Sequence, residues 1–124
     1  MSKRVNETVS FIKEQITEIP KIGIILGSGL GDLAREIVGT TSLSYDKIPN
    51  FPLSTVKGHK GKLIFGTLNG VRVVALQGRF HYYEGYSLED VVFPVRVLKF
   101  LGVENLFVSK WGSLKQAEQI IKKQ

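Results

Sequence analysis

The feature that most constrains the fold is a short apolar run that ends in a glycine-rich turn. Residues 21–26 read Lys-Ile-Gly-Ile-Ile-Leu, and residues 27–31 read Gly-Ser-Gly-Leu-Gly. The segment over residues 32–37 has the pattern of a helix, so a strand, a turn and a helix are predicted in succession. Because the strand is apolar on both faces, it needs cover from both sides. The sequence therefore predicts an α/β fold, with a mixed β-sheet flanked by helices.

Two further segments support that architecture. Apolar residues recur at three- and four-residue spacing over residues 5–19, which predicts an amphipathic helix that Pro20 stops. Residues 62–68 and 71–77 are rich in β-forming side chains, and an Asn-Gly dipeptide joins them. This dipeptide suits the positive φ angles of a tight turn, so the two runs are predicted to form a β-hairpin.

A helix is predicted after the hairpin. Ser87 is suited to cap it, and Glu89 and Asp90 are favourable near its positive end. Pro94 lacks a backbone donor, so the helix either kinks there or begins there. The buried stripe of this helix is predicted to comprise Val91, Val95, Leu98 and Leu101.

Gly102 is expected to end this helix, and residues 106–109 read as another buried strand. Together with the second hairpin strand they form a strand, helix, strand crossover. After Ser109 the character changes, because apolar residues recur at helical spacing among lysines and glutamines. The predicted organisation is an α/β domain over residues 1–109 and an amphipathic helical tail over residues 110–124.

Length and composition bound the remaining possibilities. With 124 residues, no cysteine and 23% charged residues, the chain is expected to be one globular domain without disulfides or zinc thiolate sites. Its apolar runs are shorter than the ~20 residues of a membrane-spanning helix, and the N-terminus lacks the pattern of a signal peptide. The expected location is therefore the cytoplasm, with no membrane partner.

The chain is basic, with 17 lysines and arginines against 11 acidic residues and a net charge of +6. Four lysines and one glutamate in residues 110–124 account for half of this excess, and the densest remaining cluster is the glycine-rich stretch over residues 57–62. That stretch suits a small anion better than a polymer, and no nucleic-acid motif with stacking aromatic side chains accompanies it. No specific nucleic-acid partner is expected, and electrostatic binding through the tail is the weakest alternative.

Two segments hold candidate binding residues. The turn over residues 27–31 lets backbone amides and the Ser28 hydroxyl face an anion at a helix N-terminus, although a packing turn of small residues is an equal alternative. Residues 77–86 follow a strand, where open α/β sheets usually build their sites. Arg79 offers a rigid fork to phosphate oxygens, and His81 can donate or accept a hydrogen bond near neutral pH. The alternative is that the aromatic side chains of this stretch only cover a hydrophobic edge.

Other reactive groups are few. His59, the second histidine, is either a solvated residue of the basic loop or part of an anion site. The residues offer no catalytic triad, and two histidines with scattered carboxylates without ligand spacing do not favour a metal site.

Five motifs occur in a recognisable order. They are residues 24–31, residues 49–52 (Pro-Asn-Phe-Pro), residues 58–59 with 61–63 (Gly-His and Gly-Lys-Leu), residues 77–86 (Gln-Gly-Arg-Phe-His-Tyr-Tyr-Glu-Gly-Tyr) and residues 93–96 (Phe-Pro-Val-Arg). Together they resemble the N-terminal part of the trimeric purine nucleoside phosphorylases. The resemblance covers residues 20–109, and its most specific part is the stretch over residues 78–86.

The resemblance implies a nucleoside phosphorylase-like fold and the phosphorolysis of purine (deoxy)ribonucleosides to free base and (deoxy)ribose 1-phosphate. It implies that Ser28, His59, Arg79 and His81 bind phosphate, with Arg79 and His81 as the catalytic groups, and that Tyr83 contacts the ribose. Inorganic phosphate would be the co-substrate and no cofactor is implied. The family forms homotrimers, so a homo-oligomer is expected.

The sequence departs from the family pattern after Ser109. Where the family continues with one asparagine, two alanines and two glycines, residues 110–114 read Lys-Trp-Gly-Ser-Leu. We therefore expect a truncated member of the family that keeps the phosphate half-site and lacks the base-binding half. The alternative is a non-catalytic phosphate-binding or oligomerisation module derived from the same family.

Overall fold

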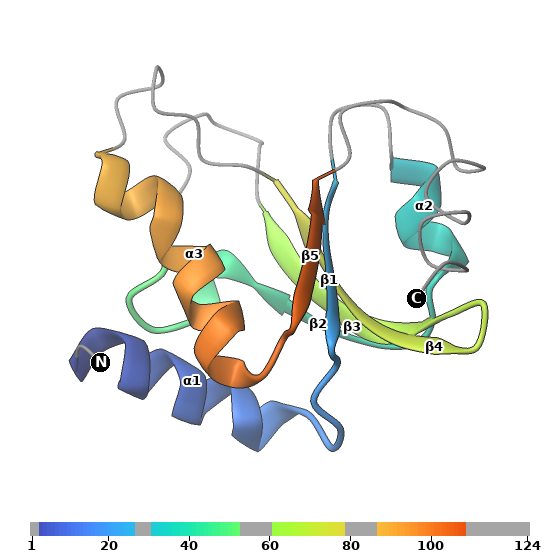
Figure 1. Cartoon of the computed structure of the whole chain (residues 1–124), viewed down its shortest axis with the longest axis horizontal. Helices are drawn as coiled ribbons and strands as arrows, with labels where there is room; N and C mark the ends of the chain where they lie inside the picture. Colours follow the sequence, from blue (N-terminus) through green and yellow to red (C-terminus); the bar gives the residue numbers. More distant parts are fainter. Residues whose placement is uncertain (1–2, 27–30, 53–60, 79–86, 109–124) are drawn as a thin grey trace.

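The computed structural model describes residues 3–26, 31–52, 61–78 and 87–108. They form one five-stranded sheet in the order β2-β3-β4-β1-β5, with helices on both faces (Figure 1). The elements are α1 (Lys3–Gln15), β1 (Ile22–Leu26), α2 (Gly31–Glu36), β2 (Val38–Ser44), the 3-10 helix η1 (Tyr45–Lys47), β3 (Lys62–Leu68), β4 (Val71–Gln77), α3 (Leu88–Leu101) and β5 (Asn105–Val108). The predicted mixed sheet flanked by helices is confirmed.

The sheet combines parallel and antiparallel pairs. β1 lies between β4 and β5 and is parallel to both, whereas β3 is antiparallel to β4 and to β2. The predicted hairpin is confirmed, since Leu68 pairs directly with Val71 across a two-residue turn. Asn69 and Gly70 both take positive φ angles, 50° and 80°, which is the backbone that a tight hairpin turn requires.

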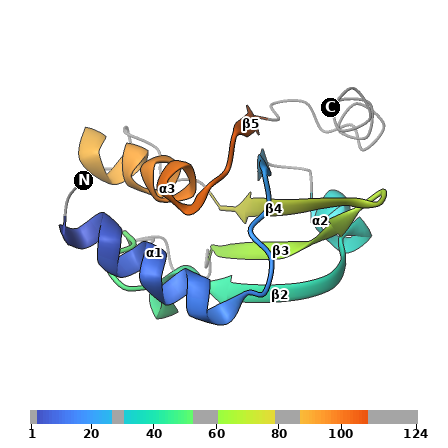
Figure 2. The ribbon, with the colours of Figure 1, turned by 60° about the horizontal axis from the view of Figure 1, so that its bottom comes forward.

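The helices divide between the two faces of the sheet. α1 and α3 lie side by side on one face, and α2 lies on the other (Figure 2). The α1 and α3 face buries a cluster that includes Ile12, Phe65 and Leu98, and the α2 face buries one that includes Leu33 and Val73. β1 is therefore covered from both sides, as its apolar composition predicts.

α1 is shorter than predicted. Val5, Val9 and Ile12 are buried as expected, but the helix ends at Gln15, and Ile19 is 44% exposed. A residue that precedes proline is disfavoured in the helical region, so the segment before Pro20 leaves the helix early and turns toward β1. The prediction of a helix as far as residue 19 was wrong at its C-terminal end.

α1 is fastened to the segment after η1. The Thr8 hydroxyl is buried and lies 2.7 Å from the Pro49 carbonyl oxygen, to which it donates a hydrogen bond. The side-chain amide of Asn50, a residue with φ of 66°, donates to the Arg4 carbonyl oxygen at 3.2 Å. These contacts join residues more than forty positions apart and hold η1 against the helix face that covers the sheet.

α3 begins at the predicted cap and continues through Pro94. The Ser87 side chain accepts a hydrogen bond from the Asp90 amide at 3.1 Å, and Gly102, with φ of 125°, ends the helix. The buried face comprises Phe93, Pro94, Val97, Leu98 and Leu101.

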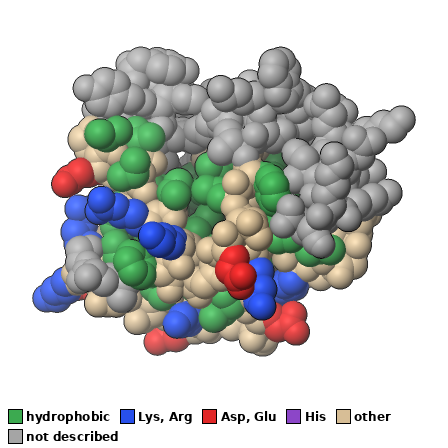
Figure 3. Space-filling view, viewed as in Figure 1, with side chains coloured by type: hydrophobic (Ala, Val, Ile, Leu, Met, Phe, Trp, Pro, Cys, Tyr) green, Lys and Arg blue, Asp and Glu red, His purple; other side chains and the backbone are tan. Residues whose placement is uncertain are grey.

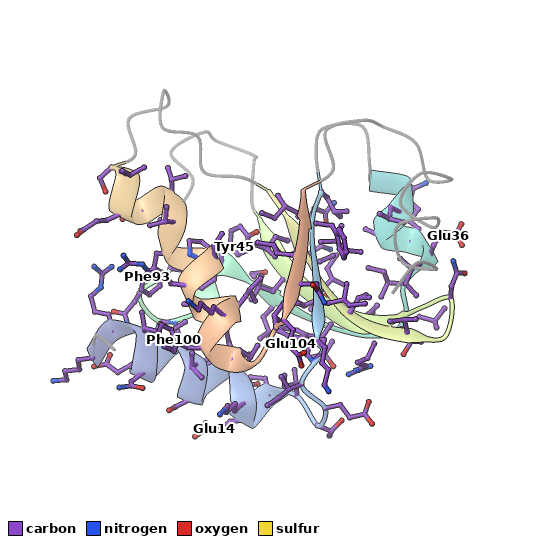
Figure 4. The ribbon with its side chains drawn as sticks, viewed as in Figure 1. Glu14, Glu36, Tyr45, Phe93, Phe100 and Glu104 are labelled. Atoms are coloured by element: carbon purple, nitrogen blue, oxygen red, sulfur yellow. The ribbon has the colours of Figure 1, made fainter. Side chains whose placement is uncertain are left out.

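The predicted stripe of α3 was therefore partly wrong. Leu98 and Leu101 are buried, but Val91 is only partly buried and Val95 is 38% exposed. Pro94 takes up a buried position because its ring adds apolar area where its missing amide proton costs one intrahelical bond. Phe100 is also exposed, and it is labelled in Figure 4. Figure 3 shows hydrophobic side chains beside lysine and arginine side chains over α3 and α1.

β2 has no counterpart among the predicted elements. Its sequence, Val-Gly-Thr-Thr-Ser-Leu-Ser, is polar, and its side chains are exposed or only partly buried because it is the edge strand beside β3. Its pairing with β3 shifts register between Val38 and Thr41.

The predicted boundary after Ser109 and the predicted tail helix lie outside the described residues. Among the described helices, none has the length and apolar character to cross a membrane.

Candidate functional site

The carboxyl ends of three strands meet at one edge of the sheet, at the top of Figure 1. Leu26 at the end of β1 pairs with Gln77 at the end of β4, and Ile25 pairs with Val108 of β5. β3 runs the other way, so its first residue, Lys62, also pairs with Gln77. Four chain segments therefore connect to the sheet at this edge: residues 27–30, 53–60, 79–86 and those that follow residue 108.

This edge is a topological switch point. The chain leaves β1 toward α2 on one face of the sheet, and it leaves β4 toward α3 on the opposite face. In open α/β sheets, ligands bind in the crevice that such diverging connections create outside the carboxyl ends of the strands. The paired positions Leu26 and Gln77 mark the place where this divergence begins.

A buried tyrosine joins two of the connections. Tyr45 of η1 is 3% exposed, and its hydroxyl donates to the Gly78 carbonyl oxygen at 2.9 Å. Its backbone amide donates to the Gly61 carbonyl oxygen at 3.0 Å. Figure 4 shows Tyr45 between α3 and the sheet. Burial raises the pKa of its phenol well above the usual value, so the hydroxyl stays protonated and remains a donor.

The two glycines at this edge touch each other. A Cβ atom at Gly78 would lie 2.9 Å from the Cα atom of Gly61, and Gly78 has φ of 106°, a conformation that favours glycine. A Cβ atom at Gly61 would overlap the ring of Tyr45. The absence of side chains at both positions therefore lets the backbones approach closely under the tyrosine ring.

Gln77 lies on the other face of the same edge. By strand alternation it shares its face with Val73 and Ala75, which pack in the cluster that contains Leu33 of α2. Its Oε1 atom is buried and has no hydrogen-bond partner within the described part of the chain. Lys62, half-buried and directly across from Gln77, brings a cation to the same face. The described edge thus presents a buried acceptor and a basic side chain beside Leu26, the last described residue before the glycine-rich turn.

The predicted binding residues themselves lie outside the described ranges: Ser28, His59, Arg79, His81 and Tyr83. Their contacts stay predictions. The structure places the residues from which their segments continue, namely Leu26 before the glycine turn, Gly61 after the basic loop and Gly78 before the arginine. All three lie at the edge that β1, β3 and β4 share.

Tyr45 is the residue that sequence reasoning missed. A single tyrosine between a serine and an aspartate, in a segment without a clear period, carries no chemical signal. Its contacts with Gly61 and Gly78, two glycines far from it in the chain, become visible only in the folded structure. Within the described ranges, no group of three histidine, cysteine or acidic side chains could hold a metal ion.

The sequence pattern of the Phosphorylase superfamily matches residues 21–116, and the chain belongs to this family. Its relatives within that family are purine nucleoside phosphorylases. Purine nucleoside phosphorylase 1 of Bacillus subtilis (strain 168) is 60% identical over 109 residues, which are 88% of this chain and 40% of that protein. The resemblance that the motifs indicated is confirmed.

Solved structures give the same result for the fold. The purine nucleoside phosphorylase of Schistosoma mansoni in complex with acetate superposes with a TM-score of 0.83 at 51% identity, over 87% of this chain and 40% of that one. The enzyme from the same organism in complex with inosine gives 0.81 at 49% identity, over 87% and 38%. The chain thus spans about 40% of the length of the curated relatives it matches.

Proposed function

We propose that the chain carries the phosphate-binding part of a purine nucleoside phosphorylase. The observation that supports the proposal is the pairing of Leu26 with Gln77, because Ser28 and Arg79 each follow one of these two residues by two positions in the chain. The edge at which this pair lies is where this class of sheet binds ligands. The Bacillus subtilis relative, named a purine nucleoside phosphorylase, and the inosine complex of the Schistosoma mansoni enzyme support the choice of substrate class.

In this proposal Ser28, His59, Arg79 and His81 hold a phosphate dianion and Tyr83 contacts the ribose. A phosphate oxygen forms a bond to the anomeric carbon while the bond from that carbon to the purine nitrogen breaks, and its electron pair leaves with the base. The catalytic groups, Arg79 and His81, keep the dianion beside the cationic character that develops on the sugar. Catalysis then rests on positioning and electrostatic stabilisation, with inorganic phosphate as co-substrate and no cofactor.

The proposal extends to a homo-oligomer, the trimer of the family, in the cytoplasm. A non-catalytic phosphate-binding or oligomerisation module is the second candidate. The two candidates share the anion site and differ in turnover, so one pair of measurements separates them. Phosphate binding together with release of free base from inosine or guanosine supports the enzyme. Phosphate binding without release of base supports the module.

The test of the anion site is calorimetric titration of the chain with inorganic phosphate. Arg79→Ala removes a charge-assisted contact worth about 1.5–3 kcal/mol, so the affinity should fall roughly tenfold to hundredfold. The matched control is Arg96→Ala, which removes the same charge from an exposed position on α3 and should leave the affinity unchanged. Equal affinity of the wild type and the Arg79→Ala variant would overturn the proposed function.

A further inference from the structure

We propose that Tyr45 is a positioning residue for the anion site, and that it acts by holding Gly78 and Gly61 together at the edge of the sheet. The inference rests on the proposed function, because it concerns the segments that carry Arg79 and His59. The family motifs quoted above do not include this tyrosine. The contacts of its hydroxyl, its ring and its backbone amide carry the argument.

The hydroxyl fixes the start of the arginine segment. Tyr45 Oη donates to the carbonyl oxygen of Gly78 across 2.9 Å, although the two residues are 33 positions apart. A peptide unit is planar, so a fixed carbonyl oxygen at Gly78 also fixes the direction in which the chain continues to Arg79. Gly78 has φ of 106°, a conformation that L-residues rarely adopt. Contacts such as the bond to Tyr45 therefore have to hold the backbone in this conformation.

The ring and the amide fix the end of the histidine segment. The Tyr45 amide donates to the Gly61 carbonyl oxygen at 3.0 Å, and the ring lies so close to Gly61 that a Cβ atom there would overlap it. His59 is two residues before Gly61 in the chain. One side chain therefore positions the ends of two segments that are predicted to bind the same anion.

The hydroxyl has a physical reason to make this bond. Tyr45 packs in an apolar cluster, with its ring centroid 5.3 Å from that of Phe51, and a buried hydroxyl without a partner there would be costly. A phenylalanine would fill the same volume. The Tyr45 hydroxyl is therefore not needed for packing. It points from the apolar cluster to the sheet edge, where it donates to the Gly78 carbonyl oxygen.

The experiment is titration of the full chain with inorganic phosphate, using the wild type, Tyr45→Phe and Ile22→Val. Tyr45→Phe keeps the ring and removes the bond to Gly78, so the affinity should fall about threefold to tenfold, the range of one hydrogen bond. Ile22→Val is the control for a general loss of stability, because it removes one buried methyl group from the end of β1 away from Leu26, in the cluster that does not contain Tyr45. Its phosphate affinity should stay within about twofold of the wild type while its unfolding midpoint falls.

A double-mutant cycle adds a readout that a purely structural role would not produce. Gly61→Ala pushes the ring away, so combining it with Tyr45→Phe should weaken phosphate binding no further than Gly61→Ala alone. Additive losses, an unchanged affinity of Tyr45→Phe, or an equal loss in Ile22→Val would each overturn the positioning role while the proposed function stands. A wild-type chain that does not bind phosphate would overturn both.

Discussion

Leu26 and Gln77 are paired neighbours at the ends of two parallel strands, and the chain leaves them toward opposite faces of the sheet. Gln77 faces the same side as α2, and its buried Oε1 atom has no hydrogen-bond partner among the described residues. An unpaired buried acceptor is costly, which gives a first prediction about this edge.

Gln77→Leu should be neutral or stabilising, by up to about 1 kcal/mol, because an apolar side chain of similar size replaces an unpaired acceptor. Urea unfolding of the wild type and the variant measures the difference. Leu76→Ala is the control, since the same strand then loses a buried apolar side chain and stability should fall. A loss of stability in Gln77→Leu would show that Oε1 is paired in solution.

Ser87→Ala should destabilise the chain by about 1 kcal/mol, the usual cost of losing an N-cap acceptor. The Ser87 side chain accepts from the Asp90 amide at 3.1 Å, and alanine leaves that amide without its partner. Ser87→Asp restores an acceptor at the positive end of α3 and should recover the lost stability. Thermal unfolding followed by circular dichroism compares the three proteins, and equal midpoints for serine and alanine would count against the cap.

Gly70→Ala should cost about 1–2 kcal/mol through backbone strain, because a residue with a Cβ atom is disfavoured at φ of 80°. No described atom lies within 4 Å of the added Cβ, so steric overlap does not contribute. Gly70→Asn should cost less, since asparagine tolerates this region better than alanine. Denaturant unfolding orders the three variants, and an alanine variant as stable as the wild type would contradict the turn geometry.

Tyr45 predicts a loss of stability in alkali. Burial raises the pKa of its phenol in the folded chain, whereas the unfolded chain ionises near the usual value of about 10. Its contribution is fully present below that pH and is lost as pH rises further, because ionisation then favours the unfolded chain. The slope attributable to one group is at most about 1.4 kcal/mol per pH unit.

Comparison of the wild type with Tyr45→Phe isolates this term from the other groups that titrate in alkali. The free energy of unfolding of the wild type should fall faster above pH 10 than that of the variant. Parallel curves would show that the phenol ionises equally well in the folded chain. The absorbance of tyrosinate measured over the same range should show one late ionisation that the variant lacks.

Much of the fold could be predicted from local sequence patterns. Elements whose apolar residues recur at regular spacing are the ones that bury their side chains in the core. β1 and the β3–β4 hairpin are predicted this way, and the hairpin turn is set by Asn69 and Gly70. β2 escaped prediction because a polar edge strand gains its structure from pairing with β3 rather than from its own composition. Val95 was misplaced because Pro94 occupies the buried side of α3 in its stead.

The residues of the candidate site likewise fall into those that a local sequence pattern indicates and those that it does not. Arg79 and His81 could be proposed as site residues because their chemistry is unusual at the end of a strand. Tyr45 could not, because its proposed positioning role depends on a distance to Gly78 and on the missing side chain of Gly61. A role that depends on distances between residues far apart in the chain leaves no local sequence pattern. A charged group directly after a strand does leave one.

The position of β1 between β4 and β5 also has a kinetic consequence. Both of its neighbours, β4 and β5, come later in the chain, and the antiparallel hairpin can form before either contact is made. Insertion of β1 between them then closes long loops and is the step we expect to limit the rate of folding. Until synthesis has reached β5, a newly made chain holds a strand that is apolar on both faces without its final neighbours, and that interval is when aggregation competes with folding.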